Sequence, residues 1–319
     1  MKNYILVKKS KIIIIIALLL SISSVKAQQL PMFTQYMFND YVLNPAVGGT
    51  NDYYQVKTNY RYQWADIDDG PRTYVLSAYG PHKTMPMGYG GYIMNDVTGP
   101  LTKTALYGSY AYNIRVTNDI RLSMGVFIGL MQYKIDLSSI TFQDLDDPIL
   151  ANGTKWTKVS PDASFGLYLY TSQYYAGFSA NQLLGNKIEL DTIEMSGGLN
   201  RLKGHYYLTG GYKYNINRNF DIEPSLFLKF IPRSPIQADI NVKTIYQKMA
   251  WAGLSYRTGD ALSILLGYNY QDMIYIGYSY DLTLSDFKQY SGSTHEIMIG
   301  VKFNRIKQGG GGGKMRKIR

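Results

Sequence analysis

Residues 261–282 read ALSILLGYNYQDMIYIGYSYDL, and large and small side chains alternate through this stretch. From Leu262 to Tyr270 the even positions are leucine, isoleucine or tyrosine, and most odd positions are small or polar. After Gln271-Asp272 the alternation resumes, with Ile276 and Tyr278 on the larger face. A period of two predicts strands, because successive side chains of a strand point to opposite faces. Two neighbouring strands of about ten residues, tipped with tyrosine, are typical of the wall of a transmembrane β-barrel.

The same pattern recurs along the chain and predicts an all-β fold, a transmembrane antiparallel β-barrel of about fourteen strands. We expect strands at residues 53–64, 72–80, 88–95, 102–114, 120–136, 161–170, 173–182, 204–215, 219–231, 236–246, 249–257, 261–270, 272–282 and 294–303. The long connections are residues 137–160, 183–203 and 283–293, and terse connections alternate with them. This rhythm predicts long extracellular loops on one rim and short periplasmic turns on the other.

Composition agrees with a barrel. The 319 residues include 31 Tyr and 31 Gly, and 45% are hydrophobic. Aromatic girdles at two membrane interfaces use many tyrosines. Beyond residue 27 no apolar run approaches the roughly 20 residues that a membrane helix needs, so strands must do the spanning. The absence of Cys excludes thiol catalysis and disulfides.

The two ends differ from the barrel. Residues 1–27 have a basic start, an apolar core and a small-residue end, which predicts a signal peptide and export to the outer membrane. Residues 28–50 are apolar but aperiodic, and we expect them either at the periplasmic rim or folded into the lumen as a plug. Residues 51–304 form the predicted barrel, and residues 305–319 are predicted to be a flexible, basic, Gly-rich tail.

Charge is concentrated at those ends. Residues 1–27 and 305–319 carry 11 of the 33 basic residues and no acid, so the 22 remaining bases and 23 acids nearly cancel. No basic groove with interleaved aromatics is present, and nucleic acid is therefore not an expected partner.

Charged residues at inward positions indicate a polar lumen. They are Lys213, Asp221, Glu223 and Lys229, and they alternate with apolar residues such as Ile222 and Leu226. Charges in a lipid-exposed strand must face water or a partner. We expect cross-pairing that stabilises the wall, with ion selectivity as the alternative. By the same alternation Ile276 faces lipid and Ser279 faces the lumen, where a charge should be tolerated.

Motifs of catalysis are absent from the sequence. It contains no HExxH, no Gly-x-Ser-x-Gly and no glycine-rich phosphate loop. The nearest approach to a catalytic pair is His295 beside Ser291 and Ser293, and the acidic run at Asp144, Asp146 and Asp147 lacks the ligand spacing of a calcium loop. We expect no enzymatic activity, no cofactor and no metal.

Several separate motifs, in order, resemble one family. They are PMFTQYMFN at 31–39, LNPA at 43–46, RYQW at 61–64, GPL at 99–101, YAY at 110–112, HYYLTGGY at 205–212, SYRTGDA at 255–261, GYSYD at 277–281 and HEIM at 295–298. Together they make the mature chain as far as Phe303 similar to the PorP/SprF family. Gln35, Tyr36, Asn39, Asn44 and Pro45 belong to its opening motif.

The resemblance implies a non-enzymatic outer-membrane barrel of the type IX secretion system, found in Gram-negative bacteria that secrete adhesins and often glide. Its expected partners are a large secreted adhesin, components of the translocon and outer-membrane lipid. The alternative is an outer-membrane pore or hydrophobic-solute transporter with an N-terminal plug. Apolar residues in the connection at 183–203, among them Leu183, Leu184, Ile188 and Leu190, favour a protein contact.

Overall fold

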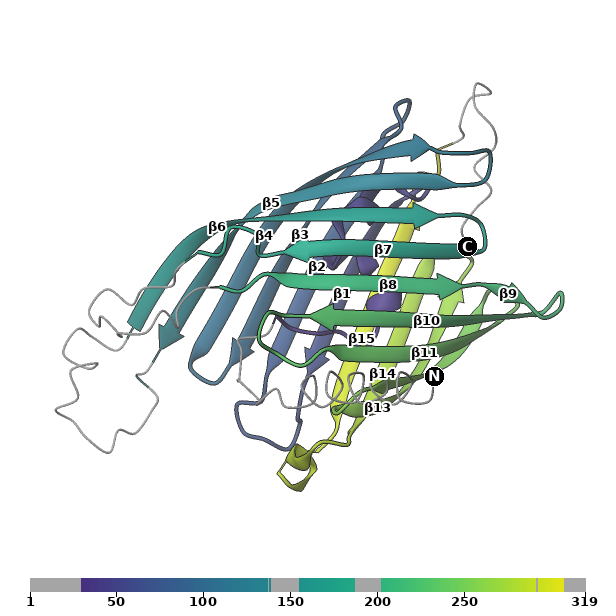
Figure 1. Cartoon of the computed structure of the whole chain (residues 1–319). Coiled ribbons are helices and arrows are strands. Elements are labelled where there is room, and N and C mark those ends of the chain that lie inside the picture. The colour runs from purple at the N-terminus through teal and green to yellow at the C-terminus, as the bar shows by residue number, and fades with distance from the viewer. Residues whose placement is uncertain (1–29, 137, 139–154, 187–201, 291, 307–319) are drawn as a thin grey trace, which may run out of the picture.

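The chain forms one antiparallel sheet that closes on itself as a barrel (Figure 1). The computed structural model describes residues 30–136, 138, 155–186, 202–290 and 292–306. The strands are β1 (Tyr54–Tyr62), β2 (Arg72–Pro81), β3 (Met87–Thr98), β4 (Leu101–Arg115), β5 (Arg121–Asp136), β6 (Lys155–Tyr170), β7 (Tyr174–Asn181), β8 (His205–Tyr212), β9 (Tyr214–Asn215), β10 (Phe220–Phe230), β11 (Gln237–Tyr246), β12 (Ala250–Arg257), β13 (Ala261–Tyr270), β14 (Ile274–Thr283) and β15 (Thr294–Phe303). The predicted signal peptide lies outside the described residues.

The sheet contains fourteen barrel strands, because β8 and β9 are one strand interrupted at Lys213 and both pair with β10. Each strand pairs with its sequence neighbours, and β1 pairs with β15 to close the ring. In this closing seam Arg61 lies opposite Glu296. The predicted fold class is confirmed.

Alternating burial divides the wall into two faces. In β14, Ile276 is 51% exposed on the outer face, whereas Ser279 is completely buried on the inner face. The strands β10, β13 and β15 alternate in the same way, with the predicted lipid-facing residues outward. An outer apolar face and an inner polar face suit a wall between lipid and a lumen. Among the described residues no helix is long and apolar enough to cross a membrane.

The two rims differ in their connections. The short-turn rim consists of residues 82–86, 116–120, 171–173, 216–219, 247–249 and 271–273, and the long-loop rim carries the opposite connections. Figure 1 shows β5 and β6 projecting beyond their neighbours at the long-loop rim. The predicted loop at 137–160 was too long, because β6 begins at Lys155 and pairs with the end of β5 as far as Asp136. Residues 155–159 show no alternation of exposure and burial, and the sequence period was therefore lost there.

Two of the short turns have the local geometry of tight hairpins. Gln247 and Lys248 both have positive φ (47° and 60°), as do Gln271 and Asp272 (51° and 56°). The residue after each pair donates its N–H to the carbonyl three positions earlier, Met249 to Tyr246 and Met273 to Tyr270. Two consecutive left-handed residues form the type I′ turn, whose twist matches that of the flanking strands.

The N-terminal segment fills the lumen. Residues 31–50, here called the plug, contain three short 3₁₀ helices, η1 (Tyr36–Phe38), η2 (Asp40–Val42) and η3 (Pro45–Gly49). A fourth, η5 (Asp286–Gln289), lies in the connection between β14 and β15. Most plug residues are buried, and Figure 1 shows the purple segment enclosed by the wall. Of the two placements left open by the sequence, the segment adopts the one inside the lumen.

Candidate functional site: a latched plug and a basic vestibule

The plug is fastened to the closing seam by a buried carboxylate. The main-chain N–H groups of Thr34 and Gln35 donate to the two oxygens of Glu296 on β15, at 2.7 and 3.2 Å. The Gln35 side chain returns a hydrogen bond to the Glu296 carbonyl at 3.0 Å. Hydrogen bonds to an ionised acceptor are stronger than neutral ones, and here both oxygens of one carboxylate hold adjacent residues of the plug.

Two buried arginines complete this group of contacts, which we call the latch. Its residues are Thr34, Gln35, Arg61, Asp239, Arg257, Asp281 and Glu296. Arg61 on β1 pairs with Glu296 at 3.1 Å and with Asp281 on β14 at 2.8 Å, and it also donates to the Thr34 hydroxyl at 2.9 Å. Arg257 on β12 pairs with Asp239 at 3.1 Å and reaches the same Thr34 hydroxyl at 3.4 Å. Buried charges are tolerated only when they are paired and hydrogen-bonded. Thr34 therefore links both arginine clusters to the plug.

Asparagines outside the latch join the plug to other strands. Asn39 donates to Asn59 of β1 at 2.8 Å, and Ser77 of β2 donates to Asn39 at 3.2 Å. Asn44 donates to the carbonyl groups of Leu167 and Phe178 on β6 and β7, at 3.0 and 3.3 Å. The Asn44 oxygen also accepts the Ala46 N–H at 3.0 Å, which caps η3, with Pro45 at its first position.

Glycines in the wall make room for η3. A Cβ at Gly125 of β5 would lie 2.5 Å from the main-chain nitrogen of Ala46, and one at Gly166 of β6 would lie 2.0 Å from the Asn44 oxygen. Next to this contact, Ser123 donates to the Ala46 carbonyl at 2.5 Å and Asn113 to the Gly49 carbonyl at 2.9 Å. The plug therefore lies directly against the main chain of the wall at these two glycines, where a larger residue than glycine would collide with it.

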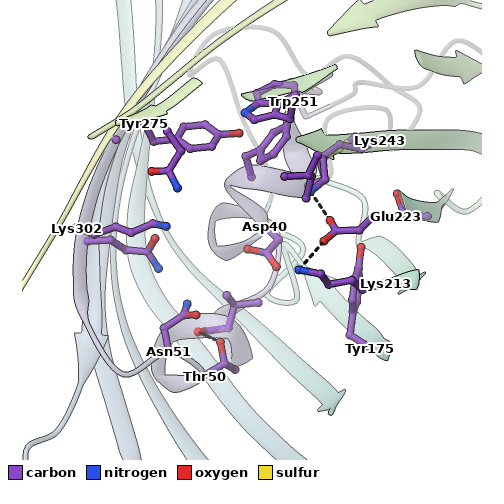
Figure 2. Close-up of a pocket in the computed structure, with 18 of the residues that line it drawn as sticks. Asp40, Thr50, Asn51, Tyr175, Lys213, Glu223, Lys243, Trp251, Tyr275 and Lys302 are labelled. Carbon is purple, nitrogen blue, oxygen red and sulfur yellow. Dashed lines mark hydrogen bonds and ion pairs between the residues drawn. The ribbon is translucent and has the colours of Figure 1, made fainter. Parts of the chain in front are cut away.

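A cavity of about 380 Å³ lies between the plug and the short-turn rim, and Figure 2 shows it. We call it the vestibule. Its wall includes five lysines and three carboxylates, which are Lys57, Lys213, Lys243, Lys248, Lys302, Asp40, Glu223 and Asp272. Its aromatic side consists of Phe38, Trp251 and Tyr275, with ring centroids 4.1 Å apart for Phe38 and Trp251 and 5.1 Å apart for Phe38 and Tyr275.

The lysines of the vestibule outnumber the carboxylates around them, even when Asp221, which pairs with Lys213 at 3.0 Å, is added to the three that line the cavity. Glu223 contacts both Lys243 and Lys213, the latter at 3.8 Å, and Lys302 pairs with Asp272 at 3.0 Å. The Lys57 amino group donates to the Phe38 carbonyl of the plug. Because the wall holds more lysines than acids, the vestibule is basic.

The predicted lumen charges lie on the inner face. Lys213 pairs with Asp221 at 3.0 Å, and Asp221 also accepts a hydrogen bond from Asn215. Glu223 is shared by two lysines as described, and Lys229 is buried on the inner face of β10. Lys213, Asp221 and Glu223 are paired side chains of the wall, and they border or adjoin the vestibule.

The five residues of the opening motif all belong to the plug. Gln35 binds the latch, Tyr36 accepts a hydrogen bond from Asn241 of β11, Asn39 bonds to β1, and Asn44 with Pro45 starts η3. All five are buried. The sequence did not identify the residues that hold the plug, Arg61, Asp239, Arg257, Asp281 and Glu296. Four of these lie in or beside the motifs that carry the resemblance, and their inward position in alternating strands was the available signal.

The apolar residues proposed for a protein contact are only partly described. Leu183 and Leu184 follow β7 at the long-loop rim and are 46% and 50% exposed. Ile188 and Leu190 lie outside the described residues.

The histidines have structural contacts. His205 accepts the Leu30 N–H at 3.2 Å, and His295, on the outer face of β15, contacts the Ser293 hydroxyl at 3.1 Å and the Tyr278 hydroxyl at 2.7 Å. In the part of the chain that the structure describes, no three His, Cys, Asp or Glu side chains are grouped to hold a metal ion.

Solved structures with a similar fold are outer-membrane barrels. A Pseudomonas aeruginosa FadL homologue shares 13% identity over 86% of this chain and 94% of its own, with a TM-score of 0.46. The Pseudomonas putida toluene transporter TodX shares 10% over 90% and 100%, with a TM-score of 0.46, and Omp33 of Acinetobacter baumannii 9% over 80% and 99%, with a TM-score of 0.43. No curated protein matches the chain.

The fold and the filled lumen define a plugged outer-membrane β-barrel. A family model described as type IX secretion system membrane protein PorP/SprF matches residues 25–301. The chain belongs to the PorP/SprF family, in agreement with the resemblance of its motifs.

Proposed function

We propose that this barrel is a non-enzymatic component of type IX secretion that holds a specific large adhesin at the cell surface. In this proposal the C-terminal domain of the adhesin docks at the long-loop rim, and translocon components deliver it. Membership of the PorP/SprF family supports the secretion role. The docking step rests on the exposure of Leu183 and Leu184 at that rim.

These leucines have the properties of an interface centre. Both are large, apolar and about half exposed, and a few such side chains usually provide most of the binding energy of an interface. The Leu183 N–H donates to the Ala163 carbonyl of β6 at 3.0 Å, and the Leu202 N–H donates to the Asn186 carbonyl at 3.0 Å. The first bond holds the start of the connection at β6, and the second joins its two described ends to each other, which lowers the entropy lost on binding.

The alternative is a pore or a hydrophobic-solute transporter with an N-terminal plug. A passive pore is disfavoured because the plug bonds to β1, β2, β6, β7, β11 and β15 on different sides of the lumen. A transporter that moves solutes through the length of the lumen would require the plug to leave these contacts in each cycle. Breaking a buried, charge-assisted network is costly, so we favour the docking role.

The test replaces Leu183 and Leu184 together with Ser. We expect one adhesin to disappear from the cell surface while other type IX cargo remains, as measured by surface blots for several cargo proteins. The matched control is Leu284→Ser, since Leu284 is also 50% exposed and lies in the connection between β14 and β15 on the same rim. A gel comparing heated and unheated samples checks that each barrel is folded.

If every cargo persists on cells carrying the folded double variant, this rim segment is not the docking surface. A fall in solute uptake with cargo unchanged would support the transporter instead.

A further inference from the structure

Three side chains that border the vestibule carry a buried polar atom with no hydrogen-bond partner among the described residues. These atoms are the Trp251 Nε1, the Tyr275 hydroxyl and the Asn269 Oδ1. Trp251 is 6% exposed. An indole nitrogen can only donate, and the tyrosine hydroxyl can donate as well. A buried donor without an acceptor destabilises the protein. This part of the vestibule wall therefore lacks mainly hydrogen-bond acceptors.

The charge of the vestibule indicates the same chemistry. Lys213 pairs with Asp221 at 3.0 Å and shares Glu223 with Lys243, and Lys302 has Asp272 as its carboxylate. Five lysines and three carboxylates border the cavity, so an anion would lower the electrostatic energy of this wall. Figure 2 shows Lys213 and Lys243 on one side of the cavity, next to Glu223, and Lys302 on the opposite side.

The third property is the aromatic wall. Trp251 and Tyr275 are nearly parallel at 14°, with ring centroids 5.9 Å apart, and Phe38 of the plug packs against both rings. Aromatic faces next to polar groups form the usual lining of a small-molecule site, whose volume is about 300–1,000 Å³. The vestibule, at about 380 Å³, falls in that range.

From these three properties we infer that the vestibule is a binding site for a small amphipathic carboxylate that enters from the short-turn side. Its carboxylate would accept from the lysines, and its aromatic or aliphatic body would pack on Phe38, Trp251 and Tyr275. Since Phe38 and Asp40 belong to the plug, an occupied vestibule would contact both the wall and the plug.

The test uses Trp251 as the reporter. The sequence has three Trp, so Trp64→Phe and Trp156→Phe together leave Trp251 alone. The purified barrel is titrated with 4-bromobenzoate, whose bromine quenches indole fluorescence on contact, and with the neutral isostere 4-bromobenzamide. We expect saturable quenching by the carboxylate, with half-saturation at a concentration at least tenfold below that of the amide. Quenching that does not saturate, or that is equal for the two compounds, would overturn the inference without any lysine variant.

Lysine variants then locate the site. Lys302→Gln and Lys243→Gln should each raise the half-saturating carboxylate concentration severalfold, and Lys302→Arg should largely retain binding. The matched control is Lys83→Gln, because Lys83 is exposed in a turn of the same rim and does not border the cavity. Unchanged binding in folded Lys302→Gln and Lys243→Gln would place the probe elsewhere.

Discussion

Glu296 illustrates how one residue can serve two parts of the fold. Its carboxylate accepts from the main chain of Thr34 and Gln35 and pairs with Arg61 across the seam. Asn59 also donates to it, at 3.3 Å. A carboxylate without these donors would be a buried charge in a site with no exposed surface. The plug and the seam therefore depend on the same group.

Arg61→Met should destabilise the folded barrel by about 3–5 kcal/mol, because the change leaves Glu296 and Asp281 buried with fewer partners. The measurement is the temperature at which the folded band disappears on a semi-native gel, which should fall clearly.

Arg115→Met is the control, since Arg115 is exposed on the short-turn rim and its side-chain hydrogen bonds among the described residues stay within its own turn, to Thr117 and Asn118. Equal transition temperatures for the two variants would show that the latch contributes nothing to stability.

At the scale of single residues, the sequence predicted the face of the wall on which a side chain lies better than it predicted the residue that the side chain contacts. Alternation placed Asp221, Glu223 and Lys229 inward correctly, because a period of two needs only local sequence. It could not show that Arg61 meets Glu296, since these residues are 235 positions apart and meet only when the barrel closes. The wall residues that Gln35 and Asn44 contact could not be predicted for the same reason.

At the scale of the elements, the plug determines which substitutions the inner face of the wall tolerates. The sequence predicted that Ser279 would accept a charge, as positions facing a water-filled lumen do. Ser279 is instead completely buried, and at its neighbour Gly277 a Cβ would lie 2.2 Å from the Gln35 side chain. The lumen at this level is occupied by protein, and that expectation was wrong.

We therefore expect both Ile276→Arg and Ser279→Arg to lower the yield of folded barrel, for different reasons. An arginine at position 276 faces lipid and costs about 2–4 kcal/mol at mid-bilayer, whereas one at position 279 collides with packed protein. Deleting residues 31–49 should restore folding of Ser279→Arg, because the lumen then holds water, and should not restore Ile276→Arg.

The measurement is the folded fraction on unheated gels for the two variants, with and without the deletion. Rescue of both variants, or of neither, would contradict the assigned facing.

The strands themselves were largely predictable, and the departures have clear causes. All fourteen strands were placed because lipid outside and a lumen inside impose alternation. The start of β6 was missed where residues 155–159 are mostly exposed on both faces. The sequence left residues 31–50 open between the rim and the lumen, because the aperiodic 3₁₀ turns are shaped by the wall around them.

For the whole molecule, we expect the barrel to be closed to ions. The latch occupies the half of the lumen near the long-loop rim, and η3 packs on β5 and β6 nearer the short turns. Reconstituted in planar bilayers, the intact protein should show little conductance, and the deletion of residues 31–49 should produce stable open channels.

The control for that recording is the Leu183→Ser, Leu184→Ser double variant, which leaves the plug untouched and should remain closed. Large, steady conductance of the intact protein would mean that the plug does not seal the lumen.

The position of the latch also sets an order of events during biogenesis. Thr34 and Glu296 are 262 residues apart, so the plug can bond to Glu296 only after β15, the last described strand, has formed. Contacts between such distant residues form late, because a long loop has to close first. Glu296 and its pairing partner Arg61 come together only when β15 joins β1. The latch therefore forms only after β15 has been synthesised and inserted, and a chain that lacks β15 would leave Thr34 and Arg61 without Glu296.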